Sequence, residues 1–450
     1  AGHPGGPGYP GGPGYPGGPG GQAPAAGGKR SKKPLFITLA AVLVVALIAV
    51  GGIIWATIAS KVGGSRSPEA AAAKIIDGFT SFDPLTLYGS LAPSEISGFT
   101  AATERLMEVD VSSKDEESLR QAADRLKNAV SIEVDGIETE TEELAEGVER
   151  VVYIGGTITI DGDEDEIVDA MMDFYALSGE LTGSSSRDYL DYMEDDLRDS
   201  IDLPYVFDFA EYEDDHDIPI GVVTVQEGGS WYVSPMLSMA DAVYRPMAEY
   251  GDAGRLGSEV VEGEPAESPE AAGAALAEAV VNGDLDDIAA HLPLAERRLL
   301  SIYGEPLFDD IDGWNDGIEL DAAEFSAETS GSTARLGIED LSISIPDFGY
   351  YGDEELSLKF SGHCVDIEHY DPYWDETERN SGCLDDVIPK KIYTELGLDE
   401  AALIAVKEGG GWFVSPVATV ADIVAIVSAR TAELSQEGKL EDLFDDISAY

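Results

Sequence analysis

Residues 224–235 read TVQEGGSWYVSP, and residues 405–416 read AVKEGGGWFVSP. In each stretch two short strand-like segments flank a Gly-Gly pair, the second of them aromatic, which predicts a β-hairpin with a tight turn. A helical stretch follows each hairpin and carries the same Ala-Asp pair, Ala240-Asp241 and Ala421-Asp422. The same element is therefore written twice, which indicates two tandem units of one fold.

The beginnings of the two units also agree. The sequence SPEAA starts at Ser67 and again at Ser268. In each case a Ser suited to cap a helix precedes Pro at the first helical position and Glu in the first turn. Each predicted helix then meets a break at Asp83 or Asp284 before a short second helix.

Alternating strands fill the middle of each unit. The first unit has Ile132 and Val134 with residues 157–160, and the second has Ile318 and Leu320 with residues 341–345. Helices followed by an antiparallel sheet predict an α+β fold. We call residues 66–245 copy one and residues 266–427 copy two, and we predict a linker at 246–265 and a C-terminal amphipathic helix at 428–450.

This pattern resembles the nuclear-transport-factor-two-like family, also called the cystatin-like or SnoaL-like cone. The resemblance rests on the Ala-Ala helix openers, on the Gly283-Asp284 break and on the strands that end in Gly-Gly-x-Trp-aromatic-Val. It implies two cone domains with apolar interiors, and we expect each to fold alone. Copy one departs from the pattern by a helical insertion near 165–200, and copy two departs by a cysteine-bounded loop.

Upstream of the repeats, residues 35–59 read LFITLAAVLVVALIAVGGIIWATIA, without a charge. At about 1.5 Å per residue a helix of this length spans roughly 37 Å, enough to cross a bilayer core of about 30 Å. Four cations precede the run and only Lys61 follows closely, which predicts a single-pass membrane protein with residues 1–34 in the cytoplasm and both copies outside. A cleaved signal peptide is the other interpretation, but the apolar run is too long for one.

Residues 1–34 are rich in Gly, Pro and Tyr, which predicts a disordered cytoplasmic tail. The tail, the membrane helix and the acidic exterior together resemble uncharacterised envelope proteins of actinobacteria. Gly52, Ala56 and Ser60 form a small-xxx-small row in the predicted helix, which offers a weak homodimer face.

Charge divides sharply along the chain. The net charge of −61 splits into +5 over residues 1–65 and −66 over the remainder. This exterior field repels nucleic acid, so we expect no nucleic-acid partner. Two interpretations of the acidity stay open, a solvated surface and a divalent-cation function. The run that starts at Asp161 begins like a calcium loop but has Glu166 where Gly is needed, and the run at Asp310 lacks a ligand, so we expect no metal.

The sequence carries no recognisable catalytic pattern. The sequence contains no Ser-His-Asp order, phosphate-binding glycine loop or HExxH motif. We therefore expect no enzyme activity and no cofactor.

Two cysteines occur, Cys364 and Cys383, both in the predicted exterior. An isolated pair in an oxidising compartment predicts a disulfide. A metal site with His363 and His369 is the alternative, although the spacing fits no zinc pattern.

Between these cysteines, Tyr370, Tyr373 and Trp374 stand among acids. Exposed aromatic residues in such a setting predict a binding site for a protein partner or a wall component. The alternative is that Trp374 covers its own sheet. From these observations we expect a membrane-anchored extracytoplasmic binding or scaffold protein of a bacterial envelope. The competing hypothesis is a carrier or sensor of small amphiphilic ligands that uses the cone interiors.

Overall fold

The computed structural model describes residues 63–98, 113–182, 194–195, 197–198, 200–251, 253–308, 317–348, 354–440 and 443. The predicted tail, the predicted membrane helix and the Gly52, Ala56, Ser60 row lie outside these residues. Within the described part of the chain, no helix combines the length and the apolar character that a membrane crossing needs.

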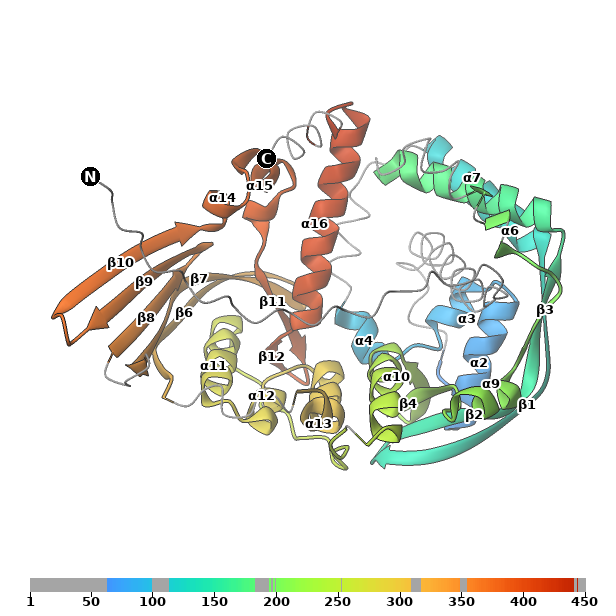
Figure 1. The fold of residues 1–450 in the computed structure, drawn as a ribbon, viewed down its shortest axis with the longest axis horizontal. Helices are drawn as coiled ribbons and strands as arrows, with labels where there is room; N and C mark the ends of the chain where they lie inside the picture. Colours follow the sequence, from blue (N-terminus) through green and yellow to red (C-terminus); the bar gives the residue numbers. More distant parts are fainter. Residues whose placement is uncertain are drawn as a thin grey trace, which may run out of the picture.

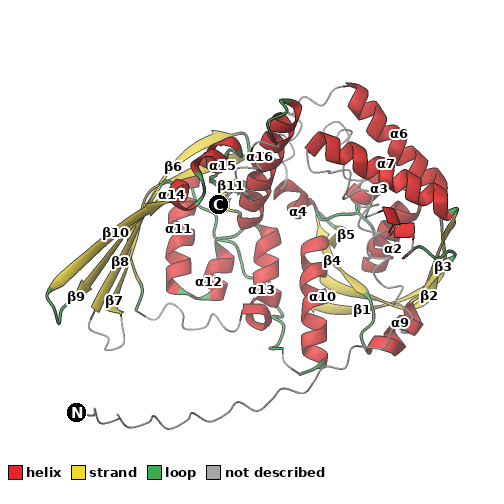
Figure 2. Ribbon diagram, turned by 45° about the horizontal axis from the view of Figure 1, so that its top comes forward, coloured by secondary structure: helices red, strands yellow, loops and turns green. Residues whose placement is uncertain are grey.

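The fold is α+β with two antiparallel sheets, one in each copy, and helices lie between them (Figures 1 and 2). Copy one has the strand order β1-β2-β4-β5 with β3 beside β2, and its sheet curls around α2. Its strands are β1 (Val130–Ala145), β2 (Val148–Gly162), β3 (Tyr205–Asp208), β4 (Gly221–Glu227) and β5 (Ser230–Ser234).

The sheet of copy two is larger, with the order β10-β9-β8-β7-β11-β12 and β6 beside β7. Its strands are β6 (Glu319–Ser330), β7 (Thr333–Phe348), β8 (Glu354–Ser361), β9 (Cys364–Asp371), β10 (Glu376–Cys383), β11 (Leu403–Glu408) and β12 (Gly411–Val414). Strands β8, β9 and β10 extend away from the helices (Figure 2).

The helices of copy one are α2 (Pro68–Thr80), α3 (Pro84–Tyr88), α4 (Pro93–Gly98), α6 (Ser113–Ala129), α7 (Glu164–Thr182), α9 (Phe209–His216) and α10 (Pro235–Glu249). Those of copy two are α11 (Pro269–Asn282), α12 (Leu285–Ala290), α13 (Leu294–Phe308), α14 (Leu384–Val387), α15 (Lys390–Glu395), the 3-10 turn η2 (Leu398–Glu400) and α16 (Pro416–Gln436). The predicted insertion in copy one contains α7.

The internal repeat extends to individual hydrogen bonds. Ser67 caps α2 by accepting from the Ala70 N–H at 3.2 Å, and Ser268 caps α11 by accepting from the Ala271 N–H at 3.2 Å. Ser65 bridges to Trp231 of β5, and Ala266 bridges to Trp412 of β12. The start of each copy is thus tied to its closing hairpin.

A buried ion pair is repeated as well. Arg150 on β2 binds the buried carboxylate of Asp241 on α10, and Arg335 on β7 binds Asp422 on α16. Both aspartates belong to the Ala-Asp pairs of the sequence repeat. Each ion pair thus connects the helix that follows the last hairpin to the sheet of its own copy.

The contacts between the copies are reciprocal. Helix α13 of copy two packs against α10 of copy one, and α4 of copy one packs against α16 of copy two. Because α4 and α13 hold equivalent places in the repeat, as do α10 and α16, the copies pack like the subunits of a two-fold dimer.

Residues from α13 complete the core of copy one. Ile302 and Tyr303 are fully buried in a cluster with Val225 and Leu237 of copy one. The Tyr303 hydroxyl donates to Asp241 Oδ1 at 3.0 Å. The copies therefore share a core, although each keeps its own sheet.

Two predicted boundaries differ from the structure. Pro246, the first residue of the predicted linker, lies inside α10, and the Gly257 N–H later in this segment donates to the Ile302 carbonyl at 2.9 Å. Residue 428, where a separate C-terminal helix was expected, lies inside α16. The apolar stretch after Pro416 contains no helix breaker, so α16 continues to Gln436. The first residue after the helix with a positive φ is Gly438. Beyond the helix, Leu440 and Leu443 pack with Leu434.

A buried carboxyl group at the junction of the copies gives a pH prediction. Glu95 on α4 is 8% exposed, accepts from the Met236 N–H at 2.9 Å and contacts the Ser234 hydroxyl. Burial raises the pKa of Glu95 to about 7, against the opposing effect of these hydrogen bonds. The folded chain therefore holds this proton more tightly than the unfolded chain does.

It follows that the contribution of Glu95 to stability is largest below pH 4.5 and is lost as pH rises towards 7. At about 1.4 kcal/mol per pKa unit, the loss reaches about 3 kcal/mol. We expect Glu95→Gln, compared with the wild type in urea unfolding from pH 5 to pH 8, to remove this part of the pH dependence. Glu249→Gln, at the exposed end of α10, serves as the control and leaves the slope unchanged. Parallel pH profiles for the wild type and Glu95→Gln would contradict the assignment.

Candidate functional site

Among the described residues of copy two, the most exposed aromatic side chains stand at the tip of the β9–β10 hairpin. The strands pair without a bulge from Glu376 opposite Asp371 to Cys383 opposite Cys364. The Asp371 carboxylate accepts from the backbone N–H groups of Tyr373 at 2.8 Å and Trp374 at 3.3 Å, an Asx turn that fixes the loop. Asp375 closes the loop with a positive φ of 49°.

Two of the three predicted aromatic residues project from this loop. Tyr373 is 79% exposed and Trp374 is 71% exposed, and their rings meet edge to face with centroids 4.8 Å apart. Trp374 therefore does not cover its own sheet. Tyr370 lies lower on β9, is partly buried and donates to Asp375 Oδ1 at 3.4 Å. The hairpin thus presents a preformed aromatic pair rather than three equivalent rings.

The base of the hairpin is covalently closed. Cys364 and Cys383 form a disulfide, which confirms the predicted pairing. The two histidines of the alternative metal site are engaged elsewhere. His363 contacts the Ala401 carbonyl at 2.9 Å and the Tyr393 hydroxyl at 2.5 Å, and His369 lies 2.7 Å from a Glu354 oxygen.

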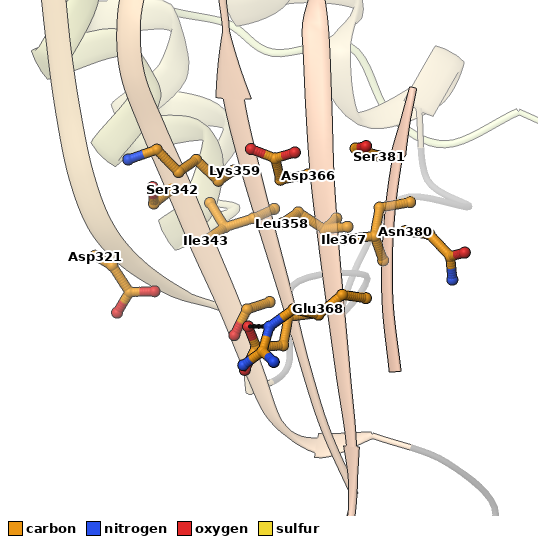
Figure 3. A pocket seen from close by; sticks show the side chains of 12 residues that line it. Asp321, Ser342, Ile343, Leu358, Lys359, Asp366, Ile367, Glu368, Asn380 and Ser381 are labelled. Carbon is orange, nitrogen blue, oxygen red and sulfur yellow. Dashed lines mark hydrogen bonds and ion pairs between the residues drawn. The ribbon is translucent and has the colours of Figure 1, made fainter. Parts of the chain in front are cut away.

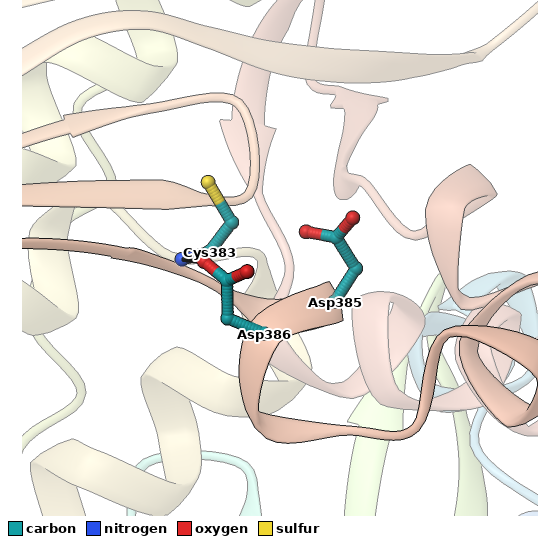
Figure 4. Close-up of side chains that lie close together, drawn as sticks. All are labelled: Cys383, Asp385 and Asp386. Carbon is teal, nitrogen blue, oxygen red and sulfur yellow. Dashed lines mark hydrogen bonds between the residues drawn. The ribbon is translucent and has the colours of Figure 1, made fainter.

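A second acidic group lies beside the disulfide. Asp385 and Asp386 stand next to Cys383 at the start of α14 (Figure 4). The Cys383 sulfur is bonded to Cys364, and Asp386 accepts from the Cys383 N–H at 3.0 Å. Asp386 therefore belongs to a helix cap, and Asp385 is an acidic residue in the first turn of α14.

Two carboxylates of the calcium-like run in copy one bind backbone N–H groups, one of them at the start of α7. Asp161 accepts from the Gly162 N–H at 2.9 Å, and Asp163 accepts from the Glu166 N–H at 3.1 Å where α7 begins. The run near Asp310 lies outside the described residues.

The sheet that carries the hairpin has two unlike faces. Ser342, Lys359, Asp366 and Ser381 lie opposite one another across β7 to β10 and share one face. The neighbouring row points to the other face and contains Ile343, Leu358, Ile367 and Asn380 (Figure 3).

A hollow of about 530 Å³ lies along these strands, and most of the side chains that line it belong to the polar face. Its charges are partly paired, because Arg379 donates two hydrogen bonds to Glu368 at 2.8 and 2.9 Å and Lys359 binds Asp340. The lining residues are Asp321, Ser342, Ile343, Ser357, Leu358, Lys359, Asp366, Ile367, Glu368, Arg379, Asn380 and Ser381.

Carboxylates dominate the hairpin. Residues 364–383 contain six acidic side chains and a single Arg. Aromatic faces beside carboxylates attract cations, since the ring quadrupole and the negative charges act together. The geometry suits the capture of a cationic group.

Comparison with known proteins identifies no relative, because the chain matches no family model, no curated protein and no solved structure. The cone resemblance accordingly stays a prediction.

Proposed function

We propose that this chain is a single-pass, membrane-anchored binding or scaffold protein of a bacterial envelope, with two extracytoplasmic domains of the nuclear-transport-factor-two-like cone type. The observation that carries the proposal is the exposed pair Tyr373 and Trp374 at the tip of a disulfide-closed hairpin. Large aromatic residues are the commonest anchors of protein interfaces. The Asx turn fixes the backbone that carries both rings, so less conformational entropy is lost when a partner binds.

The competing ligand-carrier hypothesis has less support. On the concave side of copy one, Ala72 and Ile76 of α2 pack against Val151, Tyr153 and Phe209. The chain's own side chains therefore fill this part of the interior. We therefore place binding at the hairpin and propose no catalysis.

The proposal predicts that Tyr373→Ala combined with Trp374→Ala reduces partner recovery. Truncation of an interface anchor costs about 2 kcal/mol or more, which corresponds to a loss of roughly thirtyfold in affinity. The measurement is chemical crosslinking in intact cells, followed by affinity capture of the chain and quantification of the proteins bound to it. The melting temperature is expected to stay unchanged, because neither ring packs into the core.

Tyr250→Ala is the matched control, since Tyr250 is 76% exposed and directly follows α10, outside the hairpin. It should recover the partner as the wild type does. Equal recovery by the double variant and the wild type would contradict the proposal.

A further inference from the structure

Among the described strands, β10 is the outer strand of the sheet in copy two and pairs with β9 alone. Sheet edges are commonly protected by charged side chains, Pro, bulges or short length. β10 is eight residues long, pairs without a bulge and contains no Pro, and its charged side chains are Glu376, Glu378 and Arg379. Its second edge is an accessible template for another strand.

The disulfide shows which backbone groups face outwards. The Cα atoms of Cys364 and Cys383 are 4.0 Å apart, the close spacing of a non-hydrogen-bonded pair. The Cys383 N–H accordingly points away from β9 and donates to Asp386. By alternation the N–H and C=O groups of Thr377, Arg379 and Ser381 also point away from β9. None of these backbone groups is bonded to another described segment.

The charge of the hairpin indicates what kind of segment could pair with β10. Glu376 and Glu378 lie on one face of the hairpin with Asp371, and Asp366 and Glu368 lie on the other. A second copy of this chain would bring the same carboxylates against them, which like-charge repulsion disfavours. An extended segment with Lys or Arg side chains would meet the carboxylates of the first face and the aromatic pair at the tip, whereas on the second face Arg379 already binds Glu368.

The geometry points to strand addition: a basic, extended segment of a partner protein pairs with the free edge of β10, with cationic side chains beside the hairpin carboxylates. This inference rests on the proposed function and names its binding mode and partner class. Main-chain hydrogen bonds supply affinity, and the carboxylates and the aromatic pair supply specificity.

The test uses the 450-residue chain in detergent and a fluorescent octapeptide of alternating Lys and Thr as the probe. We expect binding by anisotropy at low salt, and binding at least tenfold weaker for the matching peptide of Glu and Thr. The amides of Thr377, Arg379 and Ser381 should exchange at least tenfold more slowly with deuterium when the Lys peptide is bound. Absence of binding at 1 mM peptide, about the weakest specific affinity worth considering, would overturn the inference.

A variant pair tests the backbone contacts. Thr377→Pro with Ser381→Pro removes two outward N–H groups and leaves the bonds to β9 intact, because Pro is tolerated on an outer strand. Peptide binding should fall at least tenfold, while Thr377→Val with Ser381→Val should stay within about twofold of the wild type. Equal losses in both variants, or exchange rates that the peptide leaves unchanged, would overturn the inference whether or not the Pro variant folds fully.

The two proposals fail separately. Partner recovery from cells depends on Tyr373 and Trp374, whereas the exchange experiment reads the β10 amides. If the aromatic double variant loses the cellular partner while the Pro variant keeps the peptide, strand addition is wrong and the binding function stands.

Discussion

Asp241→Ala is expected to lower the free energy of unfolding by about 3 to 5 kcal/mol, the range for removing one partner of a buried ion pair. The Arg150 side chain is 8% exposed and the Asp241 side chain is 4% exposed, so the variant leaves a guanidinium in the core with only the more exposed Glu142 as counter-charge. It also removes the acceptor of the Tyr303 hydroxyl. Urea unfolding monitored by circular dichroism measures the change.

The repeat supplies the matched control. Asp422→Ala removes the equivalent carboxylate in copy two, but its partner Arg335 is 28% exposed and keeps access to water. We expect a smaller loss, about 2 kcal/mol, typical of a hydrogen bond to a charged group. If Asp422→Ala lowered the free energy of unfolding as much as Asp241→Ala does, the deeper burial of the Arg150–Asp241 pair and its hydrogen bond from Tyr303 would not account for the difference in stability.

The second large effect concerns the hairpin. Cys364→Ala with Cys383→Ala opens a loop with a sequence separation of 19, which by chain entropy should lower the free energy of unfolding by about 3 kcal/mol. Reduction of the wild type should have the same effect, and it should leave the double variant unchanged. The measurement is denaturant unfolding of both proteins with and without a reducing agent.

Loss of the disulfide should also weaken partner binding, because β10 then has only the backbone bonds to β9 to hold it. Unfolding midpoints that are identical with and without the disulfide would show that the hairpin lies outside the cooperative unit of the fold.

The regular elements were predictable where local chemistry is strong. Ser67 and Ser268 cap helices because Ser, Pro and Glu follow the rules of a helix start, and both Gly-Gly turns lie in hairpins. The pairing of Cys364 with Cys383 followed from their isolation. Each of these predictions depends on residues close together in the sequence, or on the fact that the chain has a single pair of cysteines.

The side-chain contacts that join distant segments of the chain were not predicted from the sequence. Arg150 lies 91 residues from Asp241, and nothing local distinguishes it from other arginines. Glu95 and Glu296 lie 201 residues apart, the spacing of the Ser-Pro-Glu openers, and each binds the capping Ser of a later helix. This shared spacing could have identified the two glutamates as equivalent residues of the repeat, but acidic residues are so common in the chain that the match did not stand out.

The hairpin strands were also missed, for the opposite reason. Residues 376–383 read ETERNSGC and lack the apolar alternation of a half-buried strand, because most of β10 is exposed to solvent. Tyr370, Tyr373 and Trp374 were predicted together from the sequence, but only the structure shows that two of them are exposed at the tip. A polar edge strand gives little sequence signal even where it carries the binding surface.

The most direct test of the central claim is site-specific photocrosslinking in intact cells that produce the chain. A benzophenone amino acid replaces Tyr373 in one variant and Tyr250 in another, two tyrosines with similar exposure of 79% and 76%. We predict a discrete covalent adduct with another envelope protein from position 373 and none from position 250. No adduct from position 373, or the same adducts from both positions, would contradict the account.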